Sequence, residues 1–218
     1  MPSHATNADP CLAQPLTAAV LAGGKNLRMD GRKKALLTVG SESILSRTLD
    51  VLAPVADPVI LIANEPLCFA GYNLSILSDV YPGCGALGGL YTALFYARTP
   101  YVLVAACDMP FLSRALVRKL LSFRGPRVDA VVPRTSLGFE PLCALYSRSC
   151  LGPVGNSLRA GKLKVTSFFS QVNLTQISED VLRETEPSLA SFVNVNTPED
   201  LAEARKRAEP GKPAGNEA

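Results

Sequence analysis

Short apolar runs alternate with helical hydrophobic stripes along this chain of 218 residues. The apolar runs are typical of buried strands and cover residues 17–21, 58–63, 74–77, 101–106, 129–132 and 142–146. Stripes with a spacing near 3.6 residues predict helices over 43–52 and about 87–97. Two N-cap signals predict further helices, one after Ser113 and one after Thr197, where Pro198 and Asp200 follow; we interpret residues 192–195 as a strand before the latter.

This alternation predicts an α/β protein, a three-layer fold with a mostly parallel sheet flanked by helices. Ligands of such sheets bind in the crevice outside the carboxyl ends of the strands. We predict one domain over residues 17–206, between disordered tails at 1–16 and 207–218, because the first is polar and the second is rich in proline and glycine.

The composition narrows the chemistry. The single histidine, His4, lies in the predicted tail, so the commonest general base and metal ligand is missing from the domain. Six scattered cysteines without a C-x-x-C pair indicate neither a zinc site nor a disulfide framework. A net charge of +3 without a long basic run favours small anionic substrates over nucleic acid. No apolar segment resembles a membrane span or signal peptide, so we expect a cytoplasmic protein without membrane contact.

The segment from residue 20 to 34 carries the strongest chemical signal. An apolar run ends at Gly23 and Gly24, and five cations follow: Lys25, Arg28, Arg32, Lys33 and Lys34. Glycines let backbone N–H groups turn toward an anion, and the cations match triphosphate oxygens. The segment fits neither the Walker A pattern nor G-x-G-x-x-G. It therefore predicts a phosphate-binding loop of another class, the alternative being a tight turn with solvated lysines.

Two acidic residues lie just after the carboxyl ends of predicted strands, where ligands of such sheets bind. Asp108 comes after the apolar run 101–106, and Asp79 comes after the run 74–77. Together with two phosphates, a carboxylate there is suited to holding Mg²⁺. The alternative is an Asp that caps the turn before Pro110.

Residues 83–88 form a literal G-x-G-x-x-G, with Asp108 lying 20 residues after its third glycine. This pattern alone indicates a dinucleotide-binding fingerprint, and hence an oxidoreductase. However, residues 78–82 separate it from the preceding strand, whereas the fingerprint begins directly after one. We expect instead that backbone amides near Gly85 and Gly88 contact a ligand at the helix start.

A second group of polar residues suggests a site for another anion. Lys162 and Lys164 lie near Arg159, and Asn194 and Asn196 precede the last helix. The alternatives are an exposed charged turn and ordinary asparagines before a helix cap.

Four segments together resemble the molybdenum cofactor guanylyltransferase family, nucleotidyltransferases with a Rossmann-like fold. They span about residues 17–205 and are Leu21-Ala-Gly-Gly with Arg28-Met29 and Lys34-Ala-Leu-Leu, Gly85-Ala-Leu-Gly-Gly89, Cys107-Asp-Met-Pro-Phe111, and Phe192-Val-Asn-Val-Asn-Thr-Pro-Glu-Asp200. The first segment is shared with cytidylyltransferases, so it indicates the reaction better than the base.

The resemblance implies Mg²⁺-dependent transfer of GMP from GTP to the phosphate of molybdenum-bound molybdopterin, with release of pyrophosphate. It implies that Lys34 and Asp108 are catalytic, that Asp108 holds the metal, and that Asp79 meets the guanosine. Further nucleotide contacts are implied at Leu21, Ala22, Gly23, Gly24, Asn64, Gly85 and Gly88, and Arg28, Asn194 and Asn196 are assigned to the acceptor or metal side. Transient contact with the molybdenum insertion machinery or recipient enzymes would follow.

The chain departs from the family pattern at four positions. Asp30 replaces a usual glycine, Lys33 a frequent acid and Ala86 a frequent proline, while a nucleotide-contacting asparagine falls near Ile62, leaving Asn64 as the nearest amide. The alternatives kept open are a cytidylyltransferase on the same or another phosphate acceptor, the dinucleotide-dependent oxidoreductase, and a non-catalytic nucleotide-binding module.

Overall fold

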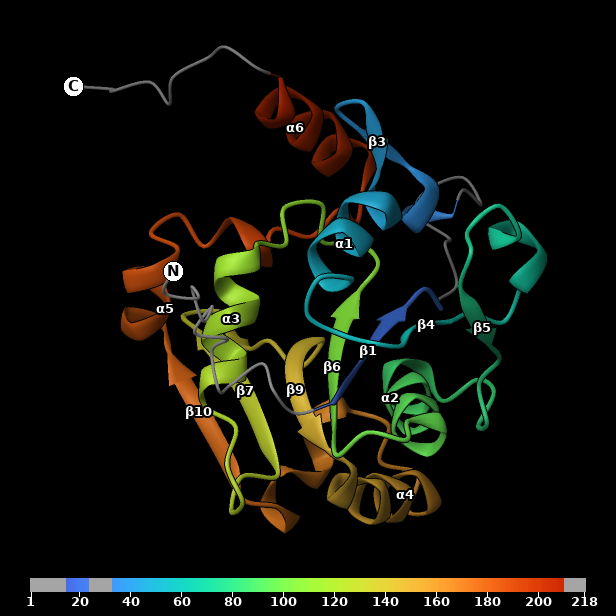
Figure 1. Ribbon diagram of the computed structural model, residues 1–218, viewed down its shortest axis with the longest axis vertical. Helices are drawn as coiled ribbons and strands as arrows, with labels where there is room; N and C mark the ends of the chain where they lie inside the picture. Colours follow the sequence, from blue (N-terminus) through green and yellow to red (C-terminus); the bar gives the residue numbers. More distant parts are fainter. Residues whose placement is uncertain (1–14, 24–32, 210–218) are drawn as a thin grey trace, which may run out of the picture.

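The computed structural model describes residues 15–23 and 33–209, which form a single eight-stranded sheet with helices on both faces (Figure 1). The strand order is β10-β7-β9-β6-β1-β4-β5, and β8 pairs with β7 at the side. The strands are β1 (Leu16–Leu21), β4 (Val59–Ile62), β5 (Ser75–Leu77), β6 (Tyr101–Ala106), β7 (Ala130–Thr135), β8 (Gly138–Phe139), β9 (Cys143–Ser147) and β10 (Leu174–Ser178). A separate small hairpin joins β2 (Thr38–Val39) to β3 (Glu42–Ser43).

The sheet is mostly parallel, as predicted. β1 runs parallel to β4 and β6, β4 to β5, and β10 to β7, whereas β9 lies antiparallel between β6 and β7. β1 and β6 are buried along their whole length, which explains their continuous apolar sequences. Their register pairs Leu21 with Ala106 at the carboxyl ends. The residues after both strands therefore meet at one edge of the sheet.

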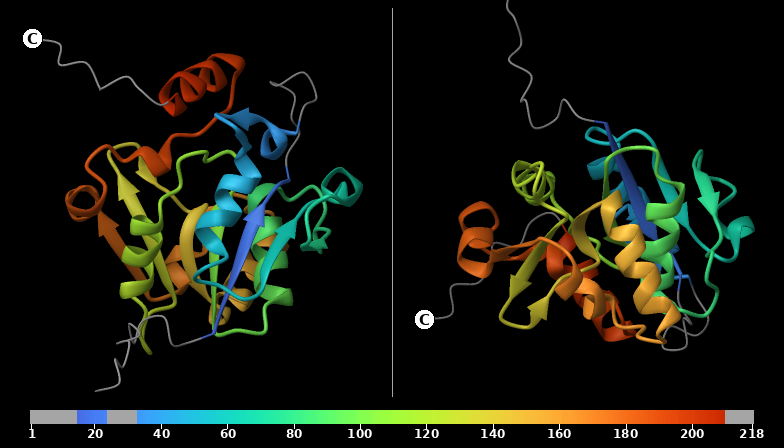
Figure 2. Two further views of the ribbon diagram at one scale, coloured as in Figure 1. Left: turned by 45° about the horizontal axis from the view of Figure 1, so that its top comes forward. Right: turned by 90° about the horizontal axis from the view of Figure 1, so that it is seen from below.

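The described residues form six α-helices, of which five pack on the two faces of the sheet. The six are α1 (Ile44–Leu52), α2 (Gly85–Tyr96), α3 (Arg114–Ser122), α4 (Leu151–Arg159), α5 (Glu179–Thr185) and α6 (Pro198–Ala208). Alternate residues of β1 enter different cores. Val20 belongs to the hydrophobic cluster that includes residues of α1, α3 and α5, and Leu21 belongs to the cluster that includes residues of α2 and α4. Figure 2 shows α2 and α4 running side by side on one face. α6 lies apart from these layers, against the β2–β3 hairpin (Figure 1).

Most predicted elements are confirmed, including the two caps. The Ser113 side chain accepts a hydrogen bond from the Leu116 N–H, and Thr197 and Asp200 form a reciprocal capping box at α6. α6 continues to Ala208, two residues beyond the predicted domain boundary. The rest of the predicted tails, residues 1–14 and 210–218, lies outside the described residues.

The strand interpretation of residues 192–195 is wrong. A short 3-10 helix, Ala190–Phe192, is followed by an extended segment that does not join the sheet. The Val195 N–H instead donates to the Asp108 carbonyl, with a distance of 2.8 Å. This contact carries Asn194 and Asn196 to the carboxyl end of β6. In the described part of the chain, no helix is long and apolar enough to cross a membrane.

Candidate functional site

Two pockets open at the carboxyl ends of the central strands and share Ala106, Asp108 and Leu142. The first, which we call the nucleotide pocket, has a volume of about 530 Å³. Most of the predicted nucleotide residues line it, namely Leu21, Ala22, Gly23, Lys34, Asn64, Asp79, Gly85 and Asp108. Residues from five separate parts of the sequence thus meet in one place. Gly24 and Arg28 lie outside the described residues.

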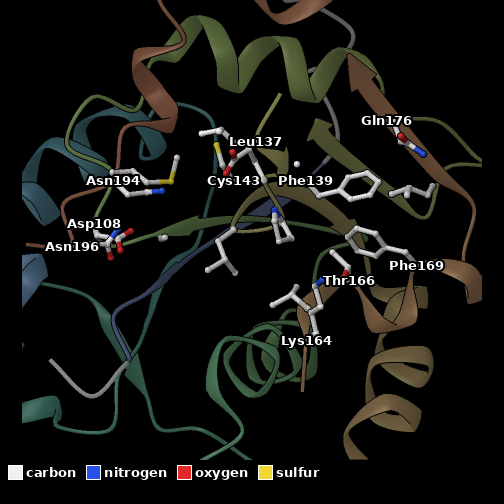
Figure 3. Close-up of a pocket in the computed structure, with 18 of the residues that line it drawn as sticks. Asp108, Leu137, Phe139, Cys143, Lys164, Thr166, Phe169, Gln176, Asn194 and Asn196 are labelled. Carbon is white, nitrogen blue, oxygen red and sulfur yellow. The ribbon is translucent and has the colours of Figure 1, made fainter. Parts of the chain in front are cut away.

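The second pocket, which we call the acceptor pocket, is larger, with a volume of about 990 Å³. Its walls come from the end of β6, from β8, β9 and β10, from residues 164–170 and from the segment before α6. They include Phe139, Glu140, Lys164, Phe169, Gln176, Asn194 and Asn196. In Figure 3, Asp108 and Asn196 lie at one side of this pocket, and Phe139, Phe169 and Gln176 lie at the other. The pocket therefore extends from a polar side to an aromatic one.

Lys34, Asp108 and Asn196 meet where the two pockets join. The Lys34 ammonium lies 3.5 Å from Asp108 Oδ2 and donates to Asn196 Oδ1, with a distance of 2.6 Å. Burial raises the pKa of Asp108 above its usual value, and the attraction to Lys34 offsets only part of that effect. Ionisation of Asp108 is therefore less favourable in the folded protein than in water. A further cation beside the carboxylate would make it more favourable. The neighbouring Lys33 forms an ion pair with Glu65 and does not share this role.

Asn196 is fixed by the cap of α6. Asp200 Oδ2 accepts hydrogen bonds from the backbone N–H groups of Asn196 and Thr197, with distances of 2.8 and 2.9 Å. The bond from Asn196 lowers the pKa of Asp200, so its carboxylate is ionised at neutral pH and the cap is formed. Asp200, which belongs to the cap of α6, therefore also positions Asn196 in the candidate site.

Asn64 and Asp79 form a reciprocal pair on the opposite wall of the nucleotide pocket. The Asn64 amide donates to Asp79 Oδ2 at 2.8 Å, and its oxygen accepts from the Asp79 N–H at 2.9 Å. The other carboxylate oxygen of Asp79 is buried without a hydrogen-bond partner among the described residues. Since a buried acceptor without a donor is unfavourable, this oxygen is suited to a donor from a bound ligand. Ile62, at the end of β4, is buried and also lines this pocket, but its apolar side chain cannot replace the hydrogen bonds of an asparagine.

The glycines before and within α2 are required for two different structural reasons. Gly83 and Gly85 adopt positive φ angles of 79° and 59°, so the turn into α2 requires them. A Cβ at Gly88 would lie 2.9 Å from the Tyr81 carbonyl oxygen, which shows that Gly88 permits close packing of the loop on the helix. Gly88 is not among the residues that line the nucleotide pocket, and residues 78–82 separate the glycines from β5.

The sequence missed the aromatic side of the acceptor pocket. Phe139 and Glu140 follow a two-residue turn after β7, and Phe169 lies in the 3-10 segment Val165–Gln171. A strand followed by Gly138-Phe-Glu-Pro was the available signal. Of the basic residues predicted to face a second anion, Lys164 lines this pocket, whereas Arg159 binds Asn156 and Lys162 is exposed.

A divalent metal would find few protein ligands here. The described residues contain no group of three or more His, Cys, Asp or Glu side chains that would hold an ion alone. Mg²⁺, however, is commonly bound by one or two carboxylates together with substrate phosphates and waters. Asp108, a carboxylate whose burial favours an added cation, fits that arrangement, with Asn196 beside it.

Known proteins resemble this chain over almost its whole described length. A family model described as MobA-like NTP transferase domain matches residues 18–205. A molybdenum cofactor guanylyltransferase from Desulfosudis oleivorans is 34% identical, covering 90% of this chain and 98% of the relative. A probable molybdenum cofactor guanylyltransferase from Pelotomaculum thermopropionicum is 39% identical, covering 88% and 93%.

Solved structures agree with the sequence relatives. The crystal structure of molybdopterin-guanine dinucleotide biosynthesis protein A from Archaeoglobus fulgidus superposes with a TM-score of 0.77 at 25% identity, covering 88% of this chain and 97% of that one. The three-layer sheet is thus the Rossmann-like fold of nucleotidyltransferases, a class that typically uses a divalent metal. With the family model matching residues 18–205 and relatives aligned over about nine-tenths of its length, the chain belongs to the MobA-like NTP transferase family.

Proposed function

We propose that the protein transfers GMP from GTP to the terminal phosphate of molybdopterin carrying molybdenum, which yields the guanine dinucleotide cofactor and pyrophosphate. The observation that carries the proposal is the position of Lys34 and Asp108 at the junction of two pockets. The nucleotide pocket lies beside the glycine segment, whose backbone N–H groups suit phosphates, and the acceptor pocket has an aromatic side, which suits a flat pterin ring. The names of the relatives from Desulfosudis oleivorans and Pelotomaculum thermopropionicum support the same reaction.

The proposed reaction is a displacement at the α-phosphorus of GTP. An oxygen of the molybdopterin phosphate forms the new P–O bond, and the bond to the α,β-bridging oxygen breaks, so pyrophosphate leaves with the electron pair. Since the attacking phosphate is already ionised, no general base is needed. Rate acceleration then comes from alignment and from cations that neutralise the α-phosphate.

Different residues of the nucleotide pocket bind different parts of GTP in this proposal. The backbone of Ala22 and Gly23 faces the phosphates, Lys34 neutralises their charge, and Asp79 with Asn64 binds the guanosine part. Mg²⁺ would be held by Asp108 together with phosphate oxygens, and when bound it neutralises the charge of the triphosphate. Asn194 and Asn196 lie on the acceptor side of Asp108. Gly24 and Arg28 lie outside the described residues. Gly24 is proposed to continue the phosphate-binding segment, and Arg28 is proposed to act on the acceptor or metal side.

A panel of nucleotides tests this proposal. The protein is mixed with molybdopterin, Mg²⁺ and one of ATP, GTP, CTP or UTP, and pyrophosphate and dinucleotide are measured. We expect both products with GTP and neither when EDTA removes the metal. Products with CTP alone would identify a cytidylyltransferase, and absence of products with GTP would refute the proposal.

A further inference from the structure

The acceptor pocket contains a carboxylate, Glu140, that the reaction above does not use. The backbone of Glu140 is fixed at the end of β8, because its N–H donates to the Pro133 carbonyl at 2.9 Å and its carbonyl accepts from the Cys143 N–H at 3.1 Å. Burial raises the pKa of its side chain, and a hydrogen bond from Thr135 offsets part of that effect. A half-buried acid is thus held rigidly in the wall of the pocket.

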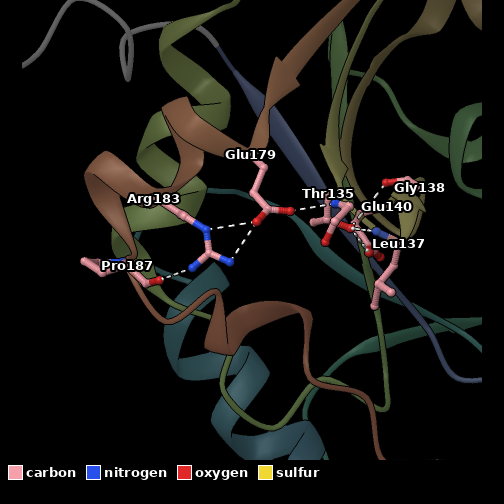
Figure 4. A network of polar contacts seen from close by, with 8 residues as sticks. Thr135, Leu137, Gly138, Glu140, Glu179, Arg183 and Pro187 are labelled. Carbon is pink, nitrogen blue, oxygen red and sulfur yellow. Dashed lines mark hydrogen bonds and ion pairs between the residues drawn. The ribbon is translucent and has the colours of Figure 1, made fainter.

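Among the described residues, Glu140 forms no ion pair, and this includes Lys164, the cation that lines the same pocket. Arg183 binds Glu179 and the Pro187 carbonyl, as Figure 4 shows, and Arg134 lies over the Phe139 ring and donates to Gln176. Among the described residues, the one side-chain partner of Glu140 is the Thr135 hydroxyl, which lies 3.2 Å from Oε1. Because each carboxylate oxygen accepts two hydrogen bonds, Glu140 keeps unused acceptor capacity toward a ligand.

Aromatic side chains stand next to this acid. Phe139 precedes Glu140, and its ring packs edge to face against Phe169, with centroids 5.3 Å apart. Both rings line the acceptor pocket on the side away from Asp108 (Figure 3). A flat heterocycle placed against these rings would lie in the part of the pocket that Glu140 also lines.

We propose that Glu140 is a specificity-determining residue that accepts hydrogen bonds from the 2-amino group and the N3–H of the pterin ring. These two parallel donors match the two oxygens of a carboxylate, as the two N–H groups of an arginine fork do. The phosphate end of the acceptor would then lie on the opposite side of the pocket, near Lys34 at the junction of the two pockets. This inference rests on the proposed function, because it names the group that selects the acceptor.

A change of ligand preference tests the inference. The probes are 6-hydroxymethylpterin and 6-hydroxymethyllumazine, which carries a 2-oxo group in place of the 2-amino group. Glutamate accepts from both donors of the pterin, whereas glutamine offers one acceptor and one donor, which match the N3–H and 2-oxo edge of lumazine. We expect wild-type protein to bind the pterin about 10- to 100-fold more tightly than the lumazine, and Glu140→Gln to reduce that ratio at least tenfold.

The affinities are measured by fluorescence titration, with Glu184→Gln as the control because Glu184 lies outside both pockets and pairs with Lys119. A ratio that stays at the wild-type value in Glu140→Gln overturns the inference, as does a wild-type protein that binds neither pteridine or does not discriminate between them. A loss of folding cannot imitate the expected result, since the readout is a ratio of two ligands on one protein.

Guanylyl transfer by the wild-type protein is measured separately with GTP and molybdopterin. We expect Glu140→Gln to raise the KM for molybdopterin at least tenfold and to leave the KM for GTP within twofold. Pterin selection that depends on Glu140 without any transfer would refute the proposed function alone. Transfer with an unchanged molybdopterin KM in Glu140→Gln would refute the role of Glu140 alone.

Discussion

Removing one partner at a time from the Lys34–Asp108 pair is expected to change stability in opposite directions. At 3.5 Å, the attraction between two unit charges is about 5 kcal/mol with an effective dielectric constant near 20. Burial of Asp108 nevertheless dominates, because the pKa of Asp108 is raised rather than lowered. Lys34→Met leaves a buried carboxylate without its cation, whereas Asp108→Asn removes the charge that is costly to bury.

The magnitude is reduced by solvent, since the side chains of Lys34 and Asp108 remain 19% and 21% exposed. We expect Lys34→Met to lower the free energy of unfolding by about 1–3 kcal/mol at pH 7.5, less than the loss seen for fully buried pairs. For a chain of this length, that corresponds to a fall in Tm of about 3–10 °C. Asp108→Asn is expected to have a Tm equal to or above that of the wild type.

The difference in stability between each variant and the wild type should change with pH in a defined direction. A carboxyl with a raised pKa in the folded state contributes stability below its unfolded pKa, near 3.8, and that contribution is lost as pH rises through the folded pKa. The advantage of Asp108→Asn over wild type should therefore appear as pH rises through this window, and the defect of Lys34→Met should fade on acidification.

Thermal unfolding followed by circular dichroism at pH 7.5 and at pH 4 measures these effects. Asn196→Ala is the control, because it removes the hydrogen bond between Lys34 and Asn196 but leaves both charges in place. Since Asn196 is exposed, we expect it to lower the free energy of unfolding by less than about 1 kcal/mol. Equal destabilisation by Lys34→Met and Asp108→Asn at pH 7.5 would refute this reasoning.

Three further sites give direct checks. Gly88→Ala is expected to destabilise by about 1–2 kcal/mol because the new Cβ meets the Tyr81 carbonyl, while GTP affinity by calorimetry stays within twofold. Its control is Gly71→Ala, where space is open and φ is not positive; this variant should be neutral or stabilising, and equal Tm values for both would contradict the packing role. Asn64→Ala should weaken GTP binding about tenfold by releasing Asp79, and an unchanged dissociation constant would exclude that role. Thr197→Ala should lower the free energy of unfolding by about 1 kcal/mol in urea titrations through loss of the α6 cap, and an unchanged midpoint would argue against that cap.

The sequence predicted that most residues of the nucleotide pocket would come together, for a physical reason. β1 and β6 are buried on both faces, so they appear as uninterrupted apolar runs, and parallel pairing brings the residues that follow them to one edge. The meeting of the glycine segment with Asp108 follows from that rule alone. The pairing of Lys34 with Asn196, by contrast, depends on the tertiary hydrogen bond from the Val195 N–H to the Asp108 carbonyl.

The acceptor side was harder to predict because local signals are weak there. α4 contains Gly152, Pro153 and Gly155, which obscure its helical stripe, and α5 has only seven residues. The antiparallel direction of β9 is not encoded in its apolar run. Phe139 and Phe169 meet only after these elements pack, so no spacing in the sequence links them.

The fate of the α-phosphate is the most direct test of the proposed guanylyl transfer. The protein is incubated with molybdopterin and Mg²⁺ and with GTP labelled with ³²P at the α position, and the products are separated. We predict that the label enters a molybdopterin-linked guanine dinucleotide in equal amounts with the pyrophosphate released, and that Asp108→Asn, although folded, forms neither. Label that appears as free GMP or GDP, or that remains in GTP, would contradict guanylyl transfer.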